Sequence, residues 1–236
     1  MILENTPYTK VIETMLSEQE KVLFFVRKEA DKVLKTAKRE GTPLLAYSTY
    51  TIPKSNNTYL FWGGKIVTEK FFQNIGRNNF MCGSCLLVNA SNGERMIYTL
   101  GEKNEGGVLV RTLMVYTSHF LRRYRERAKI PETVPTNELL ATFMCRNTEM
   151  IPLDYSQVVK KGIKNGAATQ MVDGIILGSE TRYSEAGGDF IVFKFKTFLS
   201  DSMLKANQHD ALMTKRKYYG IVKEYVKRHS PLPRQS

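Results

Sequence analysis

Five segments rich in β-branched and aromatic residues follow one another between residues 44 and 117, and turn-forming residues separate them. The segments are 44–52, 58–62, 85–89, 95–100 and 108–116. Asn92-Gly93 and Gly106-Gly107 mark hairpins, because glycine reaches the positive φ angles that tight turns need. Strands joined by such turns pair with their neighbours in the sequence, so this region predicts an antiparallel meander.

Residues 1–43 predict helix instead. Ser17 and Glu20 fit a capping box, and the apolar residues behind them recur at helical spacing, which indicates a stripe that packs on a core. These residues are Val22, Val26, Ala30, Val33 and Ala37. Gly41 and Pro43 end the pattern. We therefore expect a helical N-terminal region over 1–43 and an α+β domain over 44–236, unless the whole chain 1–236 forms one domain.

The second half of the chain alternates between predicted helices and strands. A helix over 119–128 and a short helix from Pro135 precede two strands, 168–178 and 189–199. Asp201 is expected to cap a long basic helix toward the C-terminus. The predicted fold class is therefore α+β: an antiparallel sheet packed with helices, a helical N-terminal region and a long basic C-terminal helix.

Positive charge is concentrated in two short stretches. The chain carries 35 Lys and Arg against 23 Asp and Glu, a net charge of +12. Residues 205–236 hold eight basic and two acidic residues, and residues 119–130 hold five and one. A clustered excess of this kind raises affinity for phosphate backbones. We expect a nucleic acid as the partner, RNA in preference to DNA.

Other classes of protein fit the sequence poorly. No apolar run approaches the roughly 20 residues that span a bilayer, and the N-terminus lacks the layout of a secretion signal, so we expect a cytoplasmic protein without a membrane partner. Cys82 and Cys85 have the spacing of half a zinc or redox site, yet only Cys145 and scattered histidines could complete it. We expect buried or idle thiols, no metal and no cofactor.

The segment 116–127 carries the residues best suited to catalysis. On a helix at about 100° per residue, one side is apolar and the other gathers charged groups with a histidine. The apolar side consists of Leu121, Tyr124 and Ala128, and the opposite side consists of His119, Arg123, Glu126 and Arg127. An imidazole can exchange a proton near neutral pH, and guanidiniums match phosphate oxygens. Glu126 is either a second acid–base group or the partner of an arginine. The alternative is a solvated basic helix with an incidental histidine.

Further residues are candidate contacts for nucleic acid. Alternation along the strand 189–199 puts Lys194 and Lys196 on one face and Thr197 on the other. The two lysines either complete a phosphate site or lie on the solvent face of an ordinary strand. The candidate nucleic-acid-binding residues are Arg122, Arg125, Lys194, Lys196, Thr197, Lys215, Arg216 and Lys217.

A helix with the pattern His-x-x-x-Arg-x-x-x-Arg, then a short helix, a glycine-containing strand and a strand ending in Lys-Thr-Phe, resembles the barnase–EndoU–colicin–RelE group of small ribonucleases. The likeness is greatest to its compact toxin and phage-borne members, and it covers about residues 119–200. It implies that His119 is the acid–base group, that Arg123 and Arg127 bind phosphate, and that Thr197 faces the site. A protein inhibitor is left open as a partner.

The sequence therefore predicts a metal-independent endoribonuclease, in which His119 assists proton transfer and Arg123, Arg127 and Lys196 hold the phosphoryl oxygens. Two alternatives stay open. One is a non-catalytic RNA- or DNA-binding accessory or regulatory protein of a phage or mobile element, with aromatic residues that stack on bases. The other is a structural or interaction protein whose charge serves solubility or assembly. The aromatic residues considered for stacking are Tyr47, Tyr50, Tyr59 and Trp62.

Overall fold

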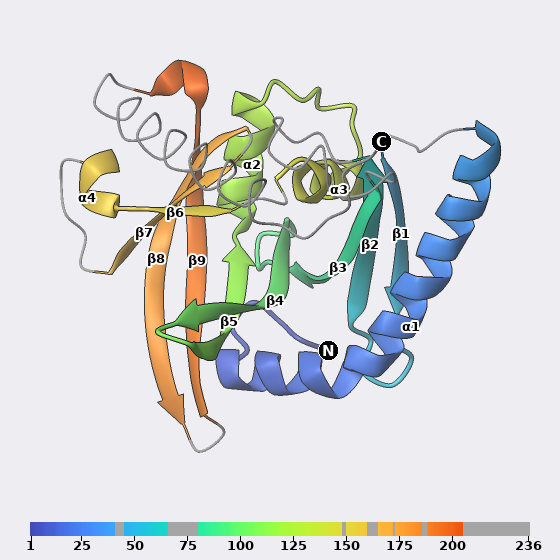
Figure 1. Cartoon of the computed structure of the whole chain (residues 1–236), viewed down its shortest axis with the longest axis horizontal. Helices are drawn as coiled ribbons and strands as arrows, with labels where there is room; N and C mark the ends of the chain where they lie inside the picture. Colours follow the sequence, from blue (N-terminus) through green and yellow to red (C-terminus); the bar gives the residue numbers. More distant parts are fainter. Residues whose placement is uncertain are drawn as a thin grey trace, which may run out of the picture.

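A mixed sheet of nine strands organises the described part of the chain (Figure 1). The computed structural model describes residues 1–40, 45–65, 80–147, 150–159, 165–171, 173–185 and 188–204. The strands are β1 (Ala46–Thr51), β2 (Thr58–Lys65), β3 (Phe80–Asn89), β4 (Arg95–Glu105), β5 (Val108–Tyr116), β6 (Ile151–Leu153), β7 (Gly166–Met171), β8 (Gly174–Glu185) and β9 (Gly188–Ser200). The helices are α1 (Tyr8–Glu40), α2 (Ser118–Arg127), α3 (Thr136–Arg146), α4 (Tyr155–Val158) and the short 3-10 helix η1 (Asp201–Met203).

The strands lie in the order β1-β2-β3-β4-β5-β9-β8-β7-β6. β1 to β5 form an antiparallel meander, as residues 44–117 predict, and β6 to β9 form a second one. β5 and β9, however, run parallel, with Arg111 opposite Phe190 and Tyr116 opposite Phe195. The prediction of an antiparallel sheet is therefore wrong, and the sheet is mixed.

The parallel pairing follows from the path of the chain after β5. The chain leaves the sheet as α2 and α3, reaches the far edge at β6 and returns one strand at a time until β9 lies beside β5. Parallel neighbours need a long crossover, and this excursion supplies it.

Two further expectations about the second half of the chain need correction. Residues 168–178 do not form one strand, because β7 ends at Met171 and β8 begins at Gly174. The long basic C-terminal helix is not seen in the described residues, where the chain from Asp201 forms only η1. Residues 205–236 lie outside the described residues, and with them the candidates Lys215, Arg216 and Lys217.

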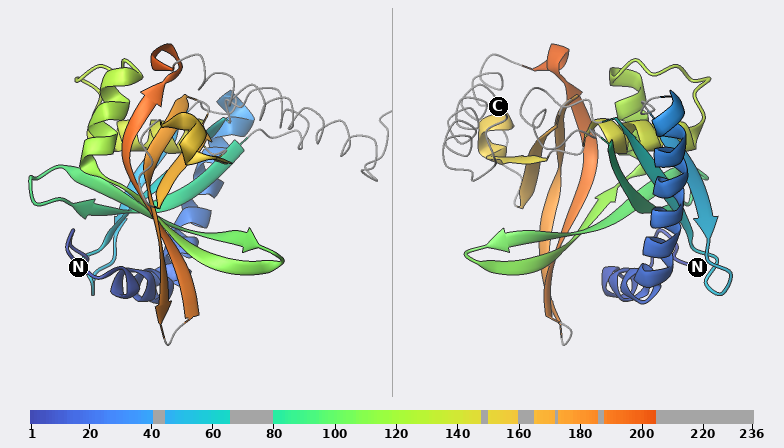
Figure 2. Two further views of the ribbon diagram at one scale, coloured as in Figure 1. Left: turned by 90° about the vertical axis from the view of Figure 1, so that its left-hand side faces the viewer. Right: turned by 45° about the vertical axis from the view of Figure 1, so that its right-hand side comes forward.

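Helices cover both faces of the twisted sheet (Figure 2). Alternation along a strand sends neighbouring side chains to opposite faces. On β2, Tyr59 joins the apolar cluster that includes Val11 of α1, whereas Leu60 joins the cluster that includes Phe143 of α3. Phe120 of α2 belongs to the same cluster as Leu60. The sheet is thus packed between α1 on one face and the pair α2 and α3 on the other.

α1 runs without interruption from Tyr8 to Glu40, although the capping box at Ser17 predicts a new start there. Ser17 Oγ instead donates to the carbonyl oxygen of Thr14, at 2.8 Å. Hydrogen bonds from a hydroxyl to the preceding turn often accompany bends, and α1 bends along its length (Figure 1). The predicted apolar stripe packs on the sheet, with Val22 buried and its later members half-buried.

A buried carboxylate, that of Glu18, joins α1 to β2. It accepts hydrogen bonds from Tyr59 Oη at 2.7 Å and from Asn57 Nδ2 at 3.1 Å. Asn57 Oδ1 in turn accepts from the backbone N–H of Ile2 at 2.7 Å, which holds the N-terminal segment on the sheet. Burial and the neighbouring Glu18 raise the pKa of Tyr59, so its hydroxyl remains a donor. A carboxylate in this position depends on such donors, because burial removes it from water.

We expect Tyr59→Phe to lower the free energy of unfolding by about 2 kcal/mol, since it removes one donor from a buried carboxylate. Tyr98 offers a matched control: it is buried in the same apolar cluster, and its hydroxyl has no hydrogen-bond partner among the described residues. Tyr98→Phe should therefore leave stability unchanged or raise it. Urea unfolding of both variants measures the difference, and equal losses would contradict the role given to Glu18.

Candidate functional site

α2 begins where β5 ends, beside the carboxyl-terminal half of β9. Thr117 caps the helix, because its Oγ1 accepts from the backbone N–H of Phe120 at 3.2 Å. The same hydroxyl donates to the carbonyl oxygen of Phe195 on β9 at 3.0 Å, and the backbone N–H of Thr117 reaches that carbonyl at 3.3 Å. The first turn of α2 is thereby fixed to β9, close to the Lys-Thr-Phe sequence.

The inner side of α2 is aromatic. Phe120 and Tyr124 are fully buried, and Leu121 is nearly so. Tyr124 packs edge-on against Phe143 of α3 and Phe198 of β9, with ring centroids 4.9 and 5.2 Å apart. The apolar side of the helix therefore faces the core, and the side with the histidine and arginines faces outward.

His119 lies at the exposed start of this outer side. Its Nδ1 is 3.0 Å from Arg122 Nη2. A guanidinium only donates, so Nδ1 accepts, and the neutral ring carries its proton on Nε2. Arg122 also approaches Glu94 at 3.7 Å, and about half of its side chain is exposed, at 52%. One long, exposed side chain therefore covers the lone pair that His119 would use to accept a proton.

The second half of the outer side holds Arg123, Glu126 and Arg127. Arg123 Nη1 donates to Glu126 Oε2 at 2.8 Å, so Glu126 is the partner of an arginine here. Arg127 donates to the carbonyl oxygen of Phe198 and, at 3.3 Å, to Thr197 Oγ1. Burial lowers the pKa of Arg127, Arg123 lowers it further and Glu126 opposes both effects. The helix and the Lys-Thr-Phe strand, far apart in the sequence, are thus in direct contact.

Arg125 serves the connection between α2 and α3. Its side chain is only 11% exposed, and it donates to the carbonyl oxygens of Pro131 and Val134 at 2.7 and 3.0 Å. The carbonyl of Pro131 also accepts from the backbone N–H of Val134 at 3.1 Å, so the guanidinium adds to the hydrogen bonds that hold this loop. Arg125 is therefore less available to a ligand than Arg122 or Arg123.

A β-bulge breaks the alternation predicted for β9. Thr197 and Phe195 pair with consecutive residues of β8, so Lys196 between them has no partner there. A Cβ at Gly178, opposite the bulge, would lie 2.1 Å from the carbonyl oxygen of Lys194, so this approach of the strands requires glycine. Strict alternation no longer places the two lysines on one face: Lys194 is half-buried, whereas Lys196 is exposed.

A polar cluster around Asp173 was not anticipated from the sequence. Asp173 lies in the turn between β7 and β8, and its carboxylate accepts from Tyr124 Oη at 2.7 Å and from Asn147 Nδ2 at 3.0 Å. Arg146, the last residue of α3, forms an ion pair with it. The dipeptide Asp173-Gly174 is itself a hairpin signal. A hairpin turn at this dipeptide divides the predicted strand 168–178 at the aspartate, as the structure does.

The cysteines take no part in this site. Cys82 and Cys85 lie on β3 three residues apart, so alternation points them to opposite faces. These two and Cys145 of α3 are free cysteines, and burial raises the pKa of the Cys145 thiol to about 12. In the described ranges, no three His, Cys, Asp or Glu side chains lie close enough to share a metal ion.

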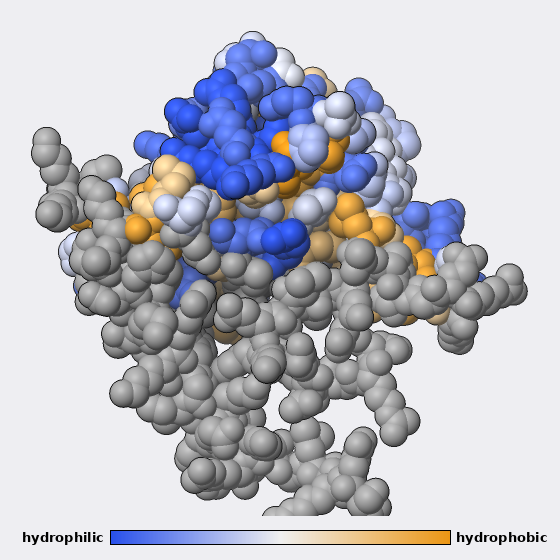
Figure 3. Space-filling view, turned by 90° about the horizontal axis from the view of Figure 1, so that it is seen from above, coloured by the Kyte–Doolittle hydropathy of each residue, from blue (hydrophilic) through white to orange (hydrophobic). Residues whose placement is uncertain are grey.

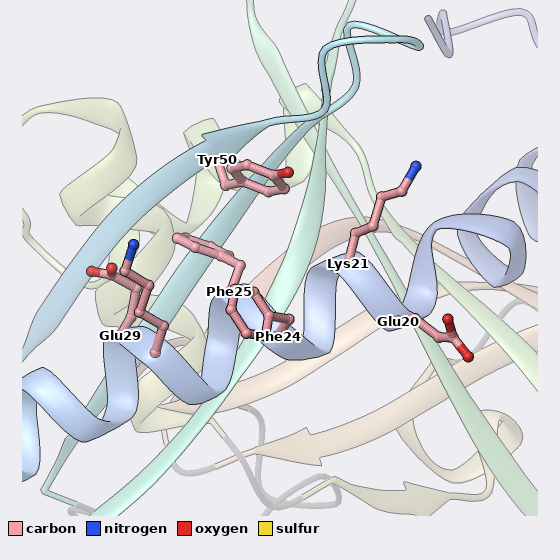
Figure 4. A pocket seen from close by; sticks show the side chains of 7 residues that line it. Glu20, Lys21, Phe24, Phe25, Glu29 and Tyr50 are labelled. Atoms are coloured by element: carbon pink, nitrogen blue, oxygen red, sulfur yellow. The ribbon is translucent and has the colours of Figure 1, made fainter.

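A separate groove of about 490 Å³ lies between α1 and β1 (Figure 4). Phe25 stacks on Tyr50 within it, with ring centroids 5.1 Å apart, and Phe24 is 72% exposed beside them. Of the other aromatics considered for stacking on bases, Tyr59 and Trp62 are buried. The groove lies on the opposite face of the sheet from α2 and holds no histidine.

The chain matches no protein-family model, no curated protein and no solved structure.

Among the described helices, none has the length and apolar character needed to cross a membrane. Seen from the end at which α2 terminates, the described surface is largely hydrophilic, with smaller apolar areas (Figure 3).

The Asp173 cluster makes a prediction about pH. Burial alone would raise the pKa of Asp173, but hydrogen bonds from Arg146, Tyr124 and Asn147 outweigh it and hold the pKa below the usual 3.8. A carboxyl group with a lowered pKa in the folded state stabilises the fold fully above pH 3.8, and this stabilisation is lost as pH falls through the folded-state value. We expect Asp173→Asn to flatten the decline in unfolding free energy below pH 3.8.

Unfolding free energies measured across this pH range for wild type and Asp173→Asn test the expectation. Asp189→Asn, on an exposed carboxylate of β9, is the control and should leave the decline unchanged. A decline as steep in Asp173→Asn as in wild type would show that the cluster does not hold its carboxylate ionised.

Proposed function

We propose that the protein is a metal-independent endoribonuclease that acts in the cytoplasm and binds the phosphodiester at the outer side of α2. The observation that carries the proposal is the hydrogen bond between Arg127 and Thr197. It joins the His-x-x-x-Arg-x-x-x-Arg helix to the Lys-Thr-Phe sequence, the two segments that carry the resemblance to small ribonucleases. α2, α3, β8 and β9 occur in the same order along the chain as the elements on which the resemblance rests, although β6, α4 and β7 lie between α3 and β8.

The exposed pairs on α2 suit exchange with a phosphate. Arg122 and Arg123 each face one carboxylate at partly exposed positions. Such surface ion pairs contribute about 0–1 kcal/mol, so a phosphate can take over a guanidinium at little energetic cost. Guanidinium forks match phosphate oxygens and remain charged as negative charge builds up on the phosphoryl group.

In this proposal, the contact between His119 and Arg122 breaks when RNA binds, and the imidazole can then act as a general base. A phosphate that draws Arg122 away uncovers Nδ1 of His119, which then accepts the proton of the attacking 2′-hydroxyl. The 2′-oxygen forms a bond to phosphorus as the bond to the 5′-oxygen breaks, and the imidazolium returns the proton to that 5′-oxygen. The products are a 2′,3′-cyclic phosphate and a 5′-hydroxyl.

We expect the purified protein to cleave single-stranded RNA in EDTA and to leave DNA intact, because DNA lacks the 2′-hydroxyl. His119→Ala should slow cleavage by about 10²-fold or more, since it removes the proton acceptor, and should change RNA affinity by less than about twofold. Gel analysis of the fragments, with identification of the cyclic phosphate end, provides the measurement.

Arg182→Gln is the control for this experiment, because Arg182 is an exposed, ion-paired arginine on β8 bonded to Glu105, outside the proposed site. It should cleave RNA at the wild-type rate. Cleavage that survives His119→Ala, or that appears only when a divalent metal is added, would overturn the proposed chemistry.

A non-catalytic RNA-binding protein is the second candidate. It is favoured by the contact of Arg122 Nη2 with His119 Nδ1 at 3.0 Å, because this contact covers the lone pair that a catalytic base needs. Under this reading, Arg123→Gln should lower the slope of log affinity against log salt by about 0.7, the value for one phosphate contact on a single strand. His119→Ala should then leave every measured property of the protein unchanged. Filter binding over a range of salt concentrations measures the slope, and the gel assay in EDTA decides between the two candidates, because only the endoribonuclease produces RNA fragments.

A further inference from the structure

We propose that Arg146 is a second phosphate-binding residue beside α2, so that the site holds a nucleic-acid strand through two of its phosphates. This inference rests on the proposed function, since it takes the ligand of α2 to be RNA. It adds a residue of another helix to the site and makes the ligand an oligonucleotide, because a nucleoside monophosphate carries only one phosphate and no phosphodiester.

Asp173 fixes the guanidinium in place. The side chain of Asp173 is only 7% exposed, and Arg146 donates to it through both Nε, at 3.0 Å to each carboxylate oxygen, and Nη2. Tyr124 and Asn147 take the remaining acceptor positions, and the backbone N–H of Asp173 donates to Asn147 Oδ1 at 3.2 Å. The carboxylate is therefore held from α2, α3 and the turn at once, and it cannot rotate without breaking several hydrogen bonds.

The outward edge of the same guanidinium is open. The side chain of Arg146 is 50% exposed, and its Nη1 has no hydrogen-bond partner in the part of the chain that the structure describes. A guanidinium carries five N–H donors in a planar fork, so the edge turned away from Asp173 can bind an anion. A donor that is already fixed loses little conformational entropy on binding, which makes it a better phosphate ligand than a free side chain.

Arg146 and Arg127 are connected through the same pair of aromatic residues, Tyr124 and Phe198. Tyr124 donates to the carboxylate that holds Arg146, and its ring packs against Phe198, 5.2 Å between centroids. Arg127 donates to the carbonyl oxygen of Phe198 itself. Tyr124 lies three residues before Arg127 on α2, so Asp173 holds Arg146 beside the last turn of the helix that carries Arg127. Both rings are buried, so a nucleic-acid strand bound here contacts the charged side chains at the surface and not the rings.

The test compares two arginines that differ mainly in position. Arg146 and Arg182 are both about half exposed, at 50% and 45%, and each pairs through Nη2 with one carboxylate. Binding of a short single-stranded oligouridylate is measured against salt concentration for wild type, Arg146→Gln and Arg182→Gln. We expect Arg146→Gln to lower the slope of log affinity against log salt by about 0.7, and Arg182→Gln to leave it unchanged.

A double variant, Arg146→Gln with Asp173→Asn, keeps the net charge of the wild type and leaves amide donors and acceptors in the cluster. It should show the same loss of slope as Arg146→Gln, and urea unfolding reports whether the variants are folded under the assay conditions. A wild-type slope in both variants, together with a reduced slope in Arg123→Gln, would overturn the role of Arg146 while the proposed function stands. If the wild type shows no salt-dependent RNA binding, the proposed function fails and this inference fails with it.

Discussion

The parallel pairing of β5 with β9 is the contact on which the arrangement of the site depends. It brings the end of β5, where α2 starts, beside the carboxyl-terminal half of β9. α2 is then tied to β9 at both ends, by Thr117 to the carbonyl of Phe195 and by Arg127 to the carbonyl of Phe198. Ten residues of helix advance about 15 Å, whereas three residues of strand advance about 10 Å. The length of the arginine side chain makes up the difference.

Local sequence patterns predicted the helices and the hairpins between neighbouring strands, but they did not predict contacts between segments that are far apart in the sequence. Turn residues and β-branched runs between 44 and 117 were enough for the antiparallel meander, since each strand pairs with its neighbour in the sequence. The pairing of β5 with β9 has no local signal, because it is decided by how the later strands return across the sheet. The prediction of one strand over 168–178 is wrong for a different reason. The hairpin signal Asp173-Gly174 was present in the sequence, but the apolar residues on both sides of it favoured a continuous strand.

The candidate site shows the same division. Helical periodicity was sufficient to separate the buried side of α2, with Leu121 and Tyr124, from the side that carries His119 and the arginines. Helical periodicity does not show which acceptor each side chain will meet, however, and the four arginines within six residues look equivalent in sequence. Their acceptors come from elsewhere: a loop carbonyl for Arg125, a strand carbonyl for Arg127 and a carboxylate on the β3–β4 hairpin for Arg122. Only the tertiary structure distinguishes the arginines that hold the fold together from those that face solvent.

The difference between arginines that bind acceptors in the fold and arginines that face solvent also explains how so basic a helix can be stable. Like charges at neighbouring helical positions repel one another, and α2 has no acidic residue in its first turn. Each arginine is compensated by its own acceptor, strongly at the half-buried positions of Arg125 and Arg127 and weakly at the exposed positions of Arg122 and Arg123. Under the proposed function, a phosphate that binds across Arg122 and Arg123 would relieve the remaining repulsion and free Nδ1 of His119 in the same step. In the proposed ribonuclease, binding and activation of the imidazole are one event when the phosphate takes the Nη2 of Arg122, the nitrogen that contacts His119.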